Sequence, residues 1–220
     1  MIIYKNKIIM HVPKTAGTSV IEAAMKDWEN LDFKINHFPI KGLESALFEY
    51  AKDYEKIALV REPVSWYKSF YNYVKGTPEY ITHDALNRVL MFNEKGEILS
   101  IDEYIENCLN FSSIMNKNID NIMRNTLKAK GGWMKWMFPS QEVEFTHNTF
   151  YQFMIDSFID ETVKTFKMET EMYDFLKYVG IKKIYKHNKS LHNIEPSEES
   201  IRKIKEKDSI LYERLGYDIN

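Results

Sequence analysis

The sequence predicts an α/β fold in which a parallel sheet is flanked by helices and interrupted by a helical insertion. Between residues 7 and 74, short apolar segments alternate with segments of helical periodicity, as in parallel strands joined by helical crossovers. From residue 76 to residue 134 the alternation stops and helical patterns dominate. Because 220 residues suit one large domain, we expect a single domain over 1–220, with 76–134 as a helical insertion or lid.

Three strands are expected in the N-terminal part, and each is followed by a helix. The strands are short, apolar and bounded by turn residues, and they cover 7–12, 33–38 and 56–60. The helices cover 20–28, 43–52 and 64–74. Thr18 or Ser19 is expected to cap the first helix, with Glu22 at the capping-box spacing from Ser19. His11 falls inside the first strand, where we expect a core histidine whose hydrogen bonds are satisfied.

The rest of the chain is expected to be largely helical. The expected helices are 101–109, 114–127 and 169–179, and the strand candidates are 157–161 and 163–166. Gly180 is suited to end the helix before it, and a polar loop follows at 186–190. Ser197 then begins a helix rich in Lys and Glu. The residues of this helix expected to face water are Ser200, Lys203 and Lys207.

Composition argues against several classes of protein. Lys and Arg number 30 and Asp and Glu 32, whereas a protein that coats nucleic acid is usually clearly basic, so we expect no nucleic-acid partner. The single cysteine, Cys108, allows no intrachain disulfide, which fits a reducing compartment. No run approaches the roughly 18 apolar residues that span a bilayer, and residues 1–7 lack the order of a signal peptide. We therefore expect no stable membrane insertion and a cytoplasmic location.

The most informative segment is 11–19, which reads His-Val-Pro-Lys-Thr-Ala-Gly-Thr-Ser. A loop between a strand and a helix presents unpaired backbone N–H groups, and the helix dipole favours an anion there. Gly17 allows close backbone approach, Lys14 adds a full charge, and Thr18 and Ser19 add hydroxyl donors. Together they predict a cradle for phosphate or sulfate. It is not a Walker A loop, because Lys14 precedes Gly17 instead of directly following a glycine.

A second segment begins where the strand 56–60 ends. Arg61 stands at the strand end, where open α/β sheets bind ligands, and Ser69 lies two turns into the next helix. A guanidinium can grip a phosphate with two hydrogen bonds while a hydroxyl donates another, so these residues predict a second phosphate contact. The alternative is an ion pair between Arg61 and a local carboxylate such as Glu62.

In register, the two segments resemble the motifs of the sulfotransferases that use 3′-phosphoadenosine 5′-phosphosulfate (PAPS). The run 13–19 resembles their 5′-phosphosulfate loop, and Arg61-Glu62-Pro63, followed by Ser69 and Tyr71, resembles their 3′-phosphate motif. The order, the strand contexts and the spacing from Arg61 to Ser69 all match. The resemblance is closest to the carbohydrate branch, which includes the uronyl 2-O-sulfotransferases. It is weaker in the C-terminal part, and 76–134 matches no part of the family.

This resemblance implies a P-loop NTPase-like fold, PAPS as the sulfate donor, a carbohydrate hydroxyl as the acceptor and no requirement for a metal. The residues implied to bind the 5′-phosphosulfate are Pro13, Lys14, Thr15, Ala16, Gly17, Thr18 and Ser19. Those implied for the 3′-phosphate are Arg61 and Ser69, and those implied to close over the nucleotide are Asn188, Lys189 and Ser190. Acceptor specificity is expected to lie in 76–134.

Transfer to a hydroxyl also needs a general base, and His37 is the candidate. It ends the second expected strand, on the side of the sheet where Lys14 is expected, and histidine suits proton abstraction near pH 7. Its position resembles that of the histidine base in some carbohydrate sulfotransferases. Other branches use a glutamate, so Glu44 is the alternative, and a purely structural role for His37 stays open. Lys14 is expected to act in catalysis by stabilising the leaving phosphate.

Two other functions compete with a sulfotransferase. A P-loop kinase would need the Walker lysine, which the sequence lacks, and a metal-holding aspartate at a strand end, of which we find no clear case. A non-catalytic nucleotide-binding module would keep the fold and lose the chemistry, and the presence of Lys14, Arg61, Ser69 and a candidate base argues against it. The spacing of His187 and His192 does not match a zinc-binding HExxH pattern.

Overall fold

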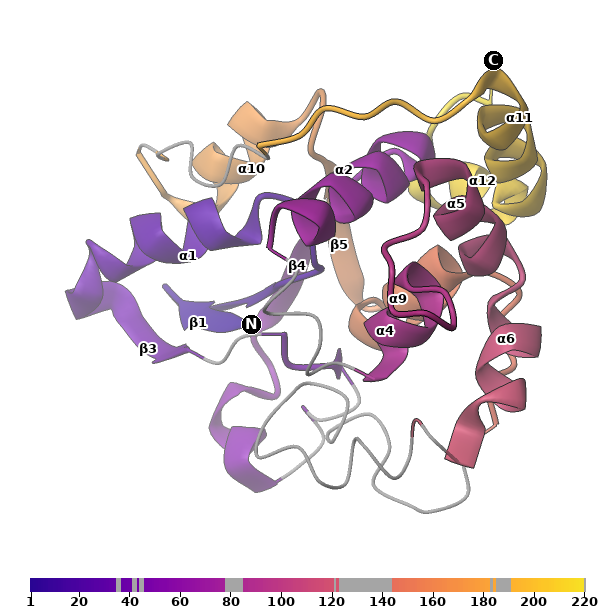
Figure 1. Ribbon diagram of the computed structural model, residues 1–220. Helices are drawn as coiled ribbons and strands as arrows, with labels where there is room; N and C mark the ends of the chain where they lie inside the picture. The colour runs from indigo at the N-terminus through magenta and orange to yellow at the C-terminus, as the bar shows by residue number, and fades with distance from the viewer. Residues whose placement is uncertain are drawn as a thin grey trace. The chain divides into compact units, whose positions relative to one another are not determined.

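The computed structural model has a mixed five-stranded sheet flanked by helices, so the α/β class is confirmed (Figure 1). It describes residues 1–34, 37–40, 43, 46–77, 85–120, 122, 144–182, 184 and 191–219. The strands are β1 (Ile2–Tyr4), β2 (Lys7–Met10), β3 (Leu31–Lys34), β4 (Glu55–Val60) and β5 (Val163–Lys167), in the order β3-β1-β2-β4-β5.

The helices of the described residues account for most of the rest. They are α1 (Gly17–Met25), α2 (Pro63–Gly76), α4 (Ala85–Met91), α5 (Ile101–Leu109), α6 (Phe111–Lys117), α9 (Phe150–Phe158), α10 (Met172–Val179), α11 (Glu198–Lys207) and α12 (Ser209–Leu215). Two short 3₁₀ helices, η1 (Trp28–Asn30) and η3 (Ala46–Ala51), lie between α1 and β4.

The sheet is mixed rather than parallel because of β1. Strands β2, β4 and β5 pair in parallel, as predicted, but β1 runs antiparallel to both of its neighbours, β2 and β3. Lys5 and Asn6, with φ of 50° and 57°, form the two-residue turn that folds β1 back onto β2. Left-handed conformations at both central positions are typical of type I′ hairpin turns. The sequence did not reveal this strand because Ile2–Tyr4 is short and its turn lacks glycine.

Several other boundaries differ from those predicted. The expected strand 157–161 is the end of α9 and the turn after it, because α9 buries apolar residues at helical spacing, including Phe150, Met154 and Phe158. A short apolar run fits a buried helix as well as a strand. The expected helix 43–52 is a 3₁₀ helix within its described part. Gly180, with φ of 75°, ends α10 as predicted.

The chain divides into two compact units. The first unit, Met1–Glu62 with Met154–Lys189, holds the sheet, α1 and α10. The second unit, Pro63–Phe153 with Ser190–Asn220, is helical in its described residues and includes the predicted insertion 76–134. The insertion contains α4, α5 and α6, and its residues 78–84, 121 and 123–134 lie outside the described part.

The core of the first unit lies between the sheet and two helices. Buried side chains of β1, β2 and β4 form one cluster with side chains of α1 and α10, so these helices cover the same face of the sheet (Figure 1). The cluster includes Ile2, Ile9, Val20, Ala24, Ile57, Leu59, Phe175 and Val179. Burial of such side chains contributes roughly 1.5–3 kcal/mol each, so this packing fixes α1 over the sheet.

Aromatic side chains fill the core of the second unit. Trp66 of α2 is fully buried and stacks on Tyr151, with ring centroids 4.4 Å apart. Phe70 contacts the ring of Trp66 and meets Phe150 edge to face. Of the aromatic residues of α2, Trp66, Tyr67, Phe70 and Tyr71 are buried in this core, whereas Tyr73 is exposed.

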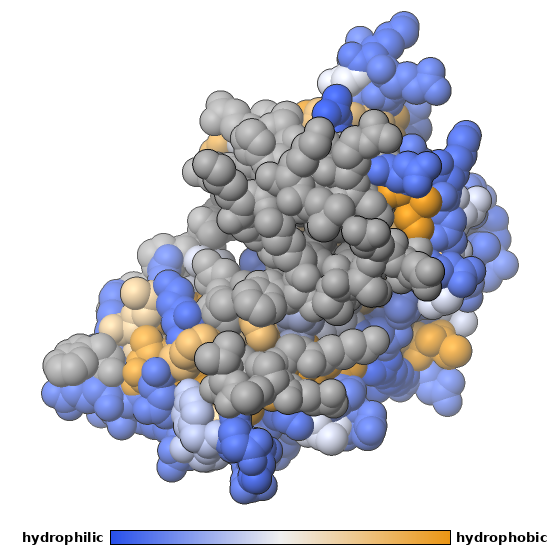
Figure 2. Space-filling model, turned by 90° about the horizontal axis from the view of Figure 1, so that it is seen from below, coloured by the Kyte–Doolittle hydropathy of each residue, from blue (hydrophilic) through white to orange (hydrophobic). Residues whose placement is uncertain are grey.

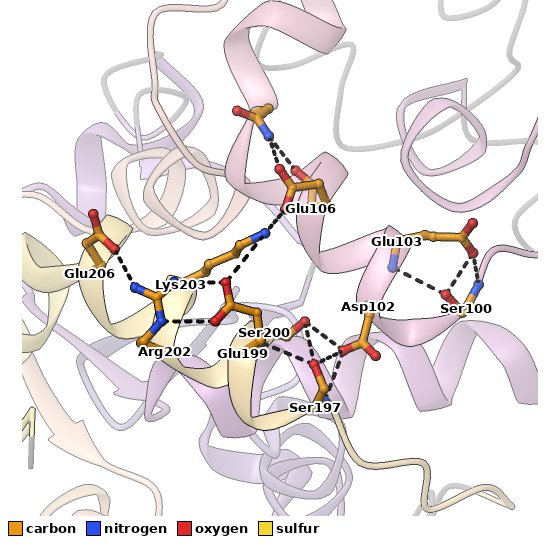
Figure 3. Close-up of polar contacts among 11 residues, drawn as sticks. Ser100, Asp102, Glu103, Glu106, Ser197, Glu199, Ser200, Arg202, Lys203 and Glu206 are labelled. Atoms are coloured by element: carbon orange, nitrogen blue, oxygen red, sulfur yellow. Dashed lines mark hydrogen bonds and ion pairs between the residues drawn. The ribbon is translucent and has the colours of Figure 1, made fainter.

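A polar network joins α5 to α11 in the second unit (Figure 3). Asp102 accepts hydrogen bonds from the N–H and hydroxyl of Ser197 and from the hydroxyl of Ser200. Ser197 caps α11 as predicted, but Ser200 is buried against Asp102 and does not face water. Lys203 is partly exposed and forms an ion pair with Glu106 at 2.9 Å. The difference arises because Asp102 reaches the first turn of α11, which sequence pattern alone does not reveal.

The described surface in Figure 2 is mostly hydrophilic, and hydrophobic residues appear there in small separate groups. No helix of the described residues is long and apolar enough to cross a membrane. The expected cytoplasmic location stays a prediction.

Asp208, between α11 and α12, is a fully buried carboxyl group in the second unit. It accepts hydrogen bonds from the hydroxyls of Tyr67 and Thr149 and from the amide of Gln152. Burial raises the pKa of Asp208 from 3.8 to about 6, although these hydrogen bonds act in the opposite direction. The folded state therefore holds this proton more tightly than the unfolded state does.

We expect the Asp208→Asn variant to lose a pH dependence that the wild type has. A raised carboxyl pKa stabilises the folded state below the unfolded pKa, and this stability is lost as pH rises through the folded pKa. The difference in unfolding free energy between wild type and variant should change by about 2 kcal/mol between pH 4 and pH 6.5. Urea unfolding at several pH values measures it. Asp102→Asn is the control, because the lowered pKa of Asp102 gives the opposite slope. Parallel curves for wild type and Asp208→Asn would refute the assignment.

Candidate functional site

The segment between β2 and α1, residues 11–16, is here called the Lys14 loop. Lys14 and Ala16 both adopt left-handed backbone conformations, with φ of 66° and 60°. Such conformations are uncommon outside glycine and occur often at functional sites. The buried hydroxyl of Thr15 donates to the carbonyl oxygen of Val12 at 2.8 Å. Thr15 therefore uses its hydroxyl to hold the loop in shape.

Helix α1 begins at the end of this loop without a side-chain cap. Ala16 is the N-cap residue, and its methyl group accepts no hydrogen bond. The predicted cap at Thr18 or Ser19 is wrong because the helix begins at Gly17, which places both hydroxyl residues in its first turn. Thr18 is exposed and Ser19 is buried, and this turn holds no acidic residue. The first N–H groups of a helix lack intrahelical acceptors and favour an anion.

Lys14 lies beside Arg61, which follows β4. The Nη1 atom of Arg61 donates to the carbonyl oxygen of Lys14 at 3.1 Å. Because β2 and β4 are neighbouring parallel strands, the two predicted anion-binding segments meet at the carboxyl edge of the sheet. Burial and the charge of Arg61 together lower the pKa of Lys14 to about 8. Two cations held this close favour a bound anion between or beside them.

A carboxylate that the sequence did not single out for this edge also faces Arg61. Glu169 follows β5, and its Oε1 lies 3.8 Å from the Nε of Arg61 and accepts the backbone N–H of Glu62 at 3.3 Å. The alternative was an ion pair between Arg61 and a local carboxylate such as Glu62, and the carboxylate beside Arg61 is that of Glu169. Arg61 and Glu169 come together because β4 and β5 are neighbouring parallel strands that end at the same edge of the sheet. The position of each residue directly after a strand candidate is the sequence signal that could have indicated this contact.

His37 lies against His11 in the first unit. Their rings stack with centroids 4.2 Å apart and planes inclined by 29°, and we call them the histidine pair. His37 has a left-handed backbone, with φ of 49°. Burial lowers the pKa of His37 to about 4 and that of His11 well below its ordinary value, so both rings are neutral at pH 7.

The expectation for His11 was right about burial and wrong about hydrogen bonding. The side chain is only 6% exposed, but β2 ends at Met10, so His11 lies in the Lys14 loop rather than in the strand. Among the described residues, the Nδ1 atoms of His11 and His37 are buried without a hydrogen-bond partner. Buried polar atoms are seldom left in this state, and functional sites are one place where it happens.

The position of the His11 ring requires a glycine at residue 17. A Cβ atom on Gly17 would lie 1.8 Å from Cδ2 and 2.2 Å from Nε2 of the His11 ring. The close approach expected at this glycine is therefore made by an imidazole of the protein itself. A small cavity of about 10 Å³ lies under the loop between Gly17, His11, Thr15 and apolar residues of β2 and α1, with room for about one water molecule.

The roles of the other predicted site residues stay predictions. Ser69 lies on α2 in the second unit. Glu44, Asn188, Lys189 and Ser190 lie outside the described residues, so their predicted roles stay predictions. Within the part of the chain that the structure describes, no three His, Cys, Asp or Glu residues are grouped to hold a metal ion.

No family model, curated protein or solved structure matches this chain. Its function is therefore inferred from the residues of the Lys14 loop, from Arg61 and from the histidine pair.

We expect Gly17→Ala to destabilise the protein because of the ring of His11. The added methyl group collides with the imidazole, and overpacking of this kind typically costs roughly 1–3 kcal/mol. In a His11→Ala background the same substitution should cost less than about 0.5 kcal/mol, since the space is then open. Urea unfolding of the two single variants and the double variant measures this coupling. Equal effects of Gly17→Ala in both backgrounds would contradict the contact.

Proposed function

We propose that this chain is a sulfotransferase that moves the sulfuryl group of PAPS to a hydroxyl of a carbohydrate acceptor. The observation that carries the proposal is the hydrogen bond from Arg61 to the carbonyl of Lys14. It joins, at one edge of the sheet, the two segments whose sequences resemble the 5′-phosphosulfate and 3′-phosphate motifs of sulfotransferases. The proposal includes a P-loop-like arrangement, which the strand–loop–helix unit of β2 and α1 supports.

The described residues fit the anionic groups of the donor. The start of α1 has no side-chain cap and no acidic residue in its first turn, and two cations stand beside it. In the proposal, Lys14, Gly17, Thr18 and Ser19 bind the 5′-phosphosulfate, and Arg61 with Ser69 binds the 3′-phosphate. Pro13, Thr15 and Ala16 shape the loop. When bound, the donor supplies the sulfuryl group and an anionic leaving group.

The chain's own residues then have two tasks. Lys14 and the first N–H groups of α1 stabilise the negative charge that collects on the leaving phosphate. His37 accepts the proton of the acceptor hydroxyl as the new oxygen–sulfur bond forms. A neutral imidazole can do this, and negative charge nearby raises an imidazole pKa, which makes His37 a stronger base when the site is filled.

We expect 3′,5′-adenosine bisphosphate to bind without metal and more tightly than ATP with magnesium. Arg61→Ala should weaken this binding by about 10- to 100-fold, because a charge-assisted hydrogen bond contributes roughly 1.5–3 kcal/mol. Calorimetric titration measures both affinities, and Lys52→Ala, which removes an exposed lysine, serves as the control. Preference for ATP with magnesium would favour a kinase. Absence of nucleotide binding would favour an interaction module.

The bisphosphate affinity should fall between pH 7 and pH 9.5. The pKa of Lys14 is lowered to about 8, so the free protein loses this charge in that range and must take up a proton to bind the anion. Lys14→Met should bind weakly and without this decline. A decline of the same size in Lys14→Met would show that another group is responsible.

His37→Ala should lower turnover by about 100-fold or more while leaving the bisphosphate affinity within about threefold of wild type. Transfer from radiolabelled PAPS to a panel of uronic-acid polysaccharides and simple glycosides measures it. Glu44→Gln is the parallel variant. If it lowers turnover and His37→Ala does not, Glu44 is the base.

A further inference from the structure

The histidine pair has a geometry that a single general base does not require. His11 comes from the Lys14 loop, whereas His37 follows β3, and their rings lie face to face at 4.2 Å. Each ring has a buried Nδ1 atom without a partner among the described residues. His11 also fills the space beside Gly17, so its ring contacts both the first residue of α1 and the ring of His37.

This contact fixes the orientation of both rings. The His11 ring already occupies the position that a Cβ atom on Gly17 would take, so it has no room to move toward that residue. His37 is held by its left-handed backbone and by the stack. An imidazole held in this way presents its nitrogens in a constant direction, which proton transfer requires.

The surroundings of the pair allow at most one added proton. The charged groups that act on the rings are Lys14, with Arg61 beyond it, and the buried amino group of Met1. Burial lowers the pKa of the Met1 amino group to about 5, so this group becomes positive only in acid. Charge on His37 opposes charge on His11. Two imidazolium rings at 4.2 Å would repel each other strongly in a site of low polarity.

We propose that His11 is a positioning residue for His37. Its ring fixes the orientation of the His37 imidazole, and the short distance between the rings prevents both from being protonated at the same time. The catalytic part of this inference rests on the proposed function. In that reaction the proton passes from the acceptor oxygen to a ring nitrogen of His37 and then to water, while His11 stays neutral. His11 touches no substrate in this scheme and acts only through His37.

The first experiment needs no turnover. Histidine ring signals are followed by NMR from pH 8 to pH 3 in wild type, His11→Ala, His11→Phe and His37→Asn. In His37→Asn, His11 should titrate about one pH unit or more above its wild-type midpoint, because the opposing charge is gone. In His11→Ala, the midpoint of His37 should rise by a similar amount as water enters. His11→Phe keeps a flat ring, so the midpoint of His37 should change by less than half a unit.

The second experiment uses the pH profile of sulfate transfer. The acidic limb of kcat/KM should move to higher pH in His11→Ala and stay in place in His11→Phe, with KM for PAPS unchanged in both. His192→Ala, which alters an exposed histidine of the second unit, should leave the profile unchanged. A residue needed only for folding would lower activity without moving this limb.

Each part can be overturned separately. An unchanged His11 midpoint in His37→Asn would refute the exclusion of a second proton. An unchanged His37 midpoint in folded His11→Ala would refute the positioning role. If His11→Ala does not fold, His11→Phe decides, since a shift of its His37 midpoint by one unit or more would also refute that role. Absence of bisphosphate binding would refute the proposed function and leave the NMR result standing.

Discussion

The parallel pairing of β2 with β4 is the constraint on which the rest of the site depends. Its register sets Met10 opposite Ala58, so both strands end at the same edge of the sheet. The Lys14 loop leaves one strand and Arg61 follows the other, which puts a guanidinium within hydrogen-bond distance of the Lys14 carbonyl. Strand register therefore places the charge of Arg61, which adds to burial in lowering the pKa of Lys14. A shift of one residue would turn the side chains of a strand to the opposite face of the sheet.

Strong local signals were readable from the sequence. The strand 56–60, the helix that begins near Pro63 and the cap at Ser197 were predicted close to their observed positions, because short-range pattern and capping chemistry determine them. The Lys14 loop was identified by its residue types. Its position between a strand and a helix was likewise expected from the flanking segments.

Features that depend on distant residues were not readable. The antiparallel β1 is too short to stand out, and the segment 157–161, which was expected to be a strand, contains the end of α9. The stack of His11 on His37 and the approach of Glu169 to Arg61 join residues far apart in the chain. No local pattern encodes such contacts, because the sheet order produces them. The same holds for Ser200, whose burial depends on Asp102.

The fully buried carboxyl of Asp208 has a consequence for the behaviour of the chain in mild acid. In the second unit, folding raises the pKa of Asp208 and so favours its protonation. In the first unit, folding lowers the pKa of His37 and so disfavours protonation of the histidine pair. Between pH 6.5 and pH 4, acidification therefore adds stability through Asp208 and removes stability through the histidine pair. Amide hydrogen exchange can follow the two effects separately, because it reports the opening free energy of each region of a chain.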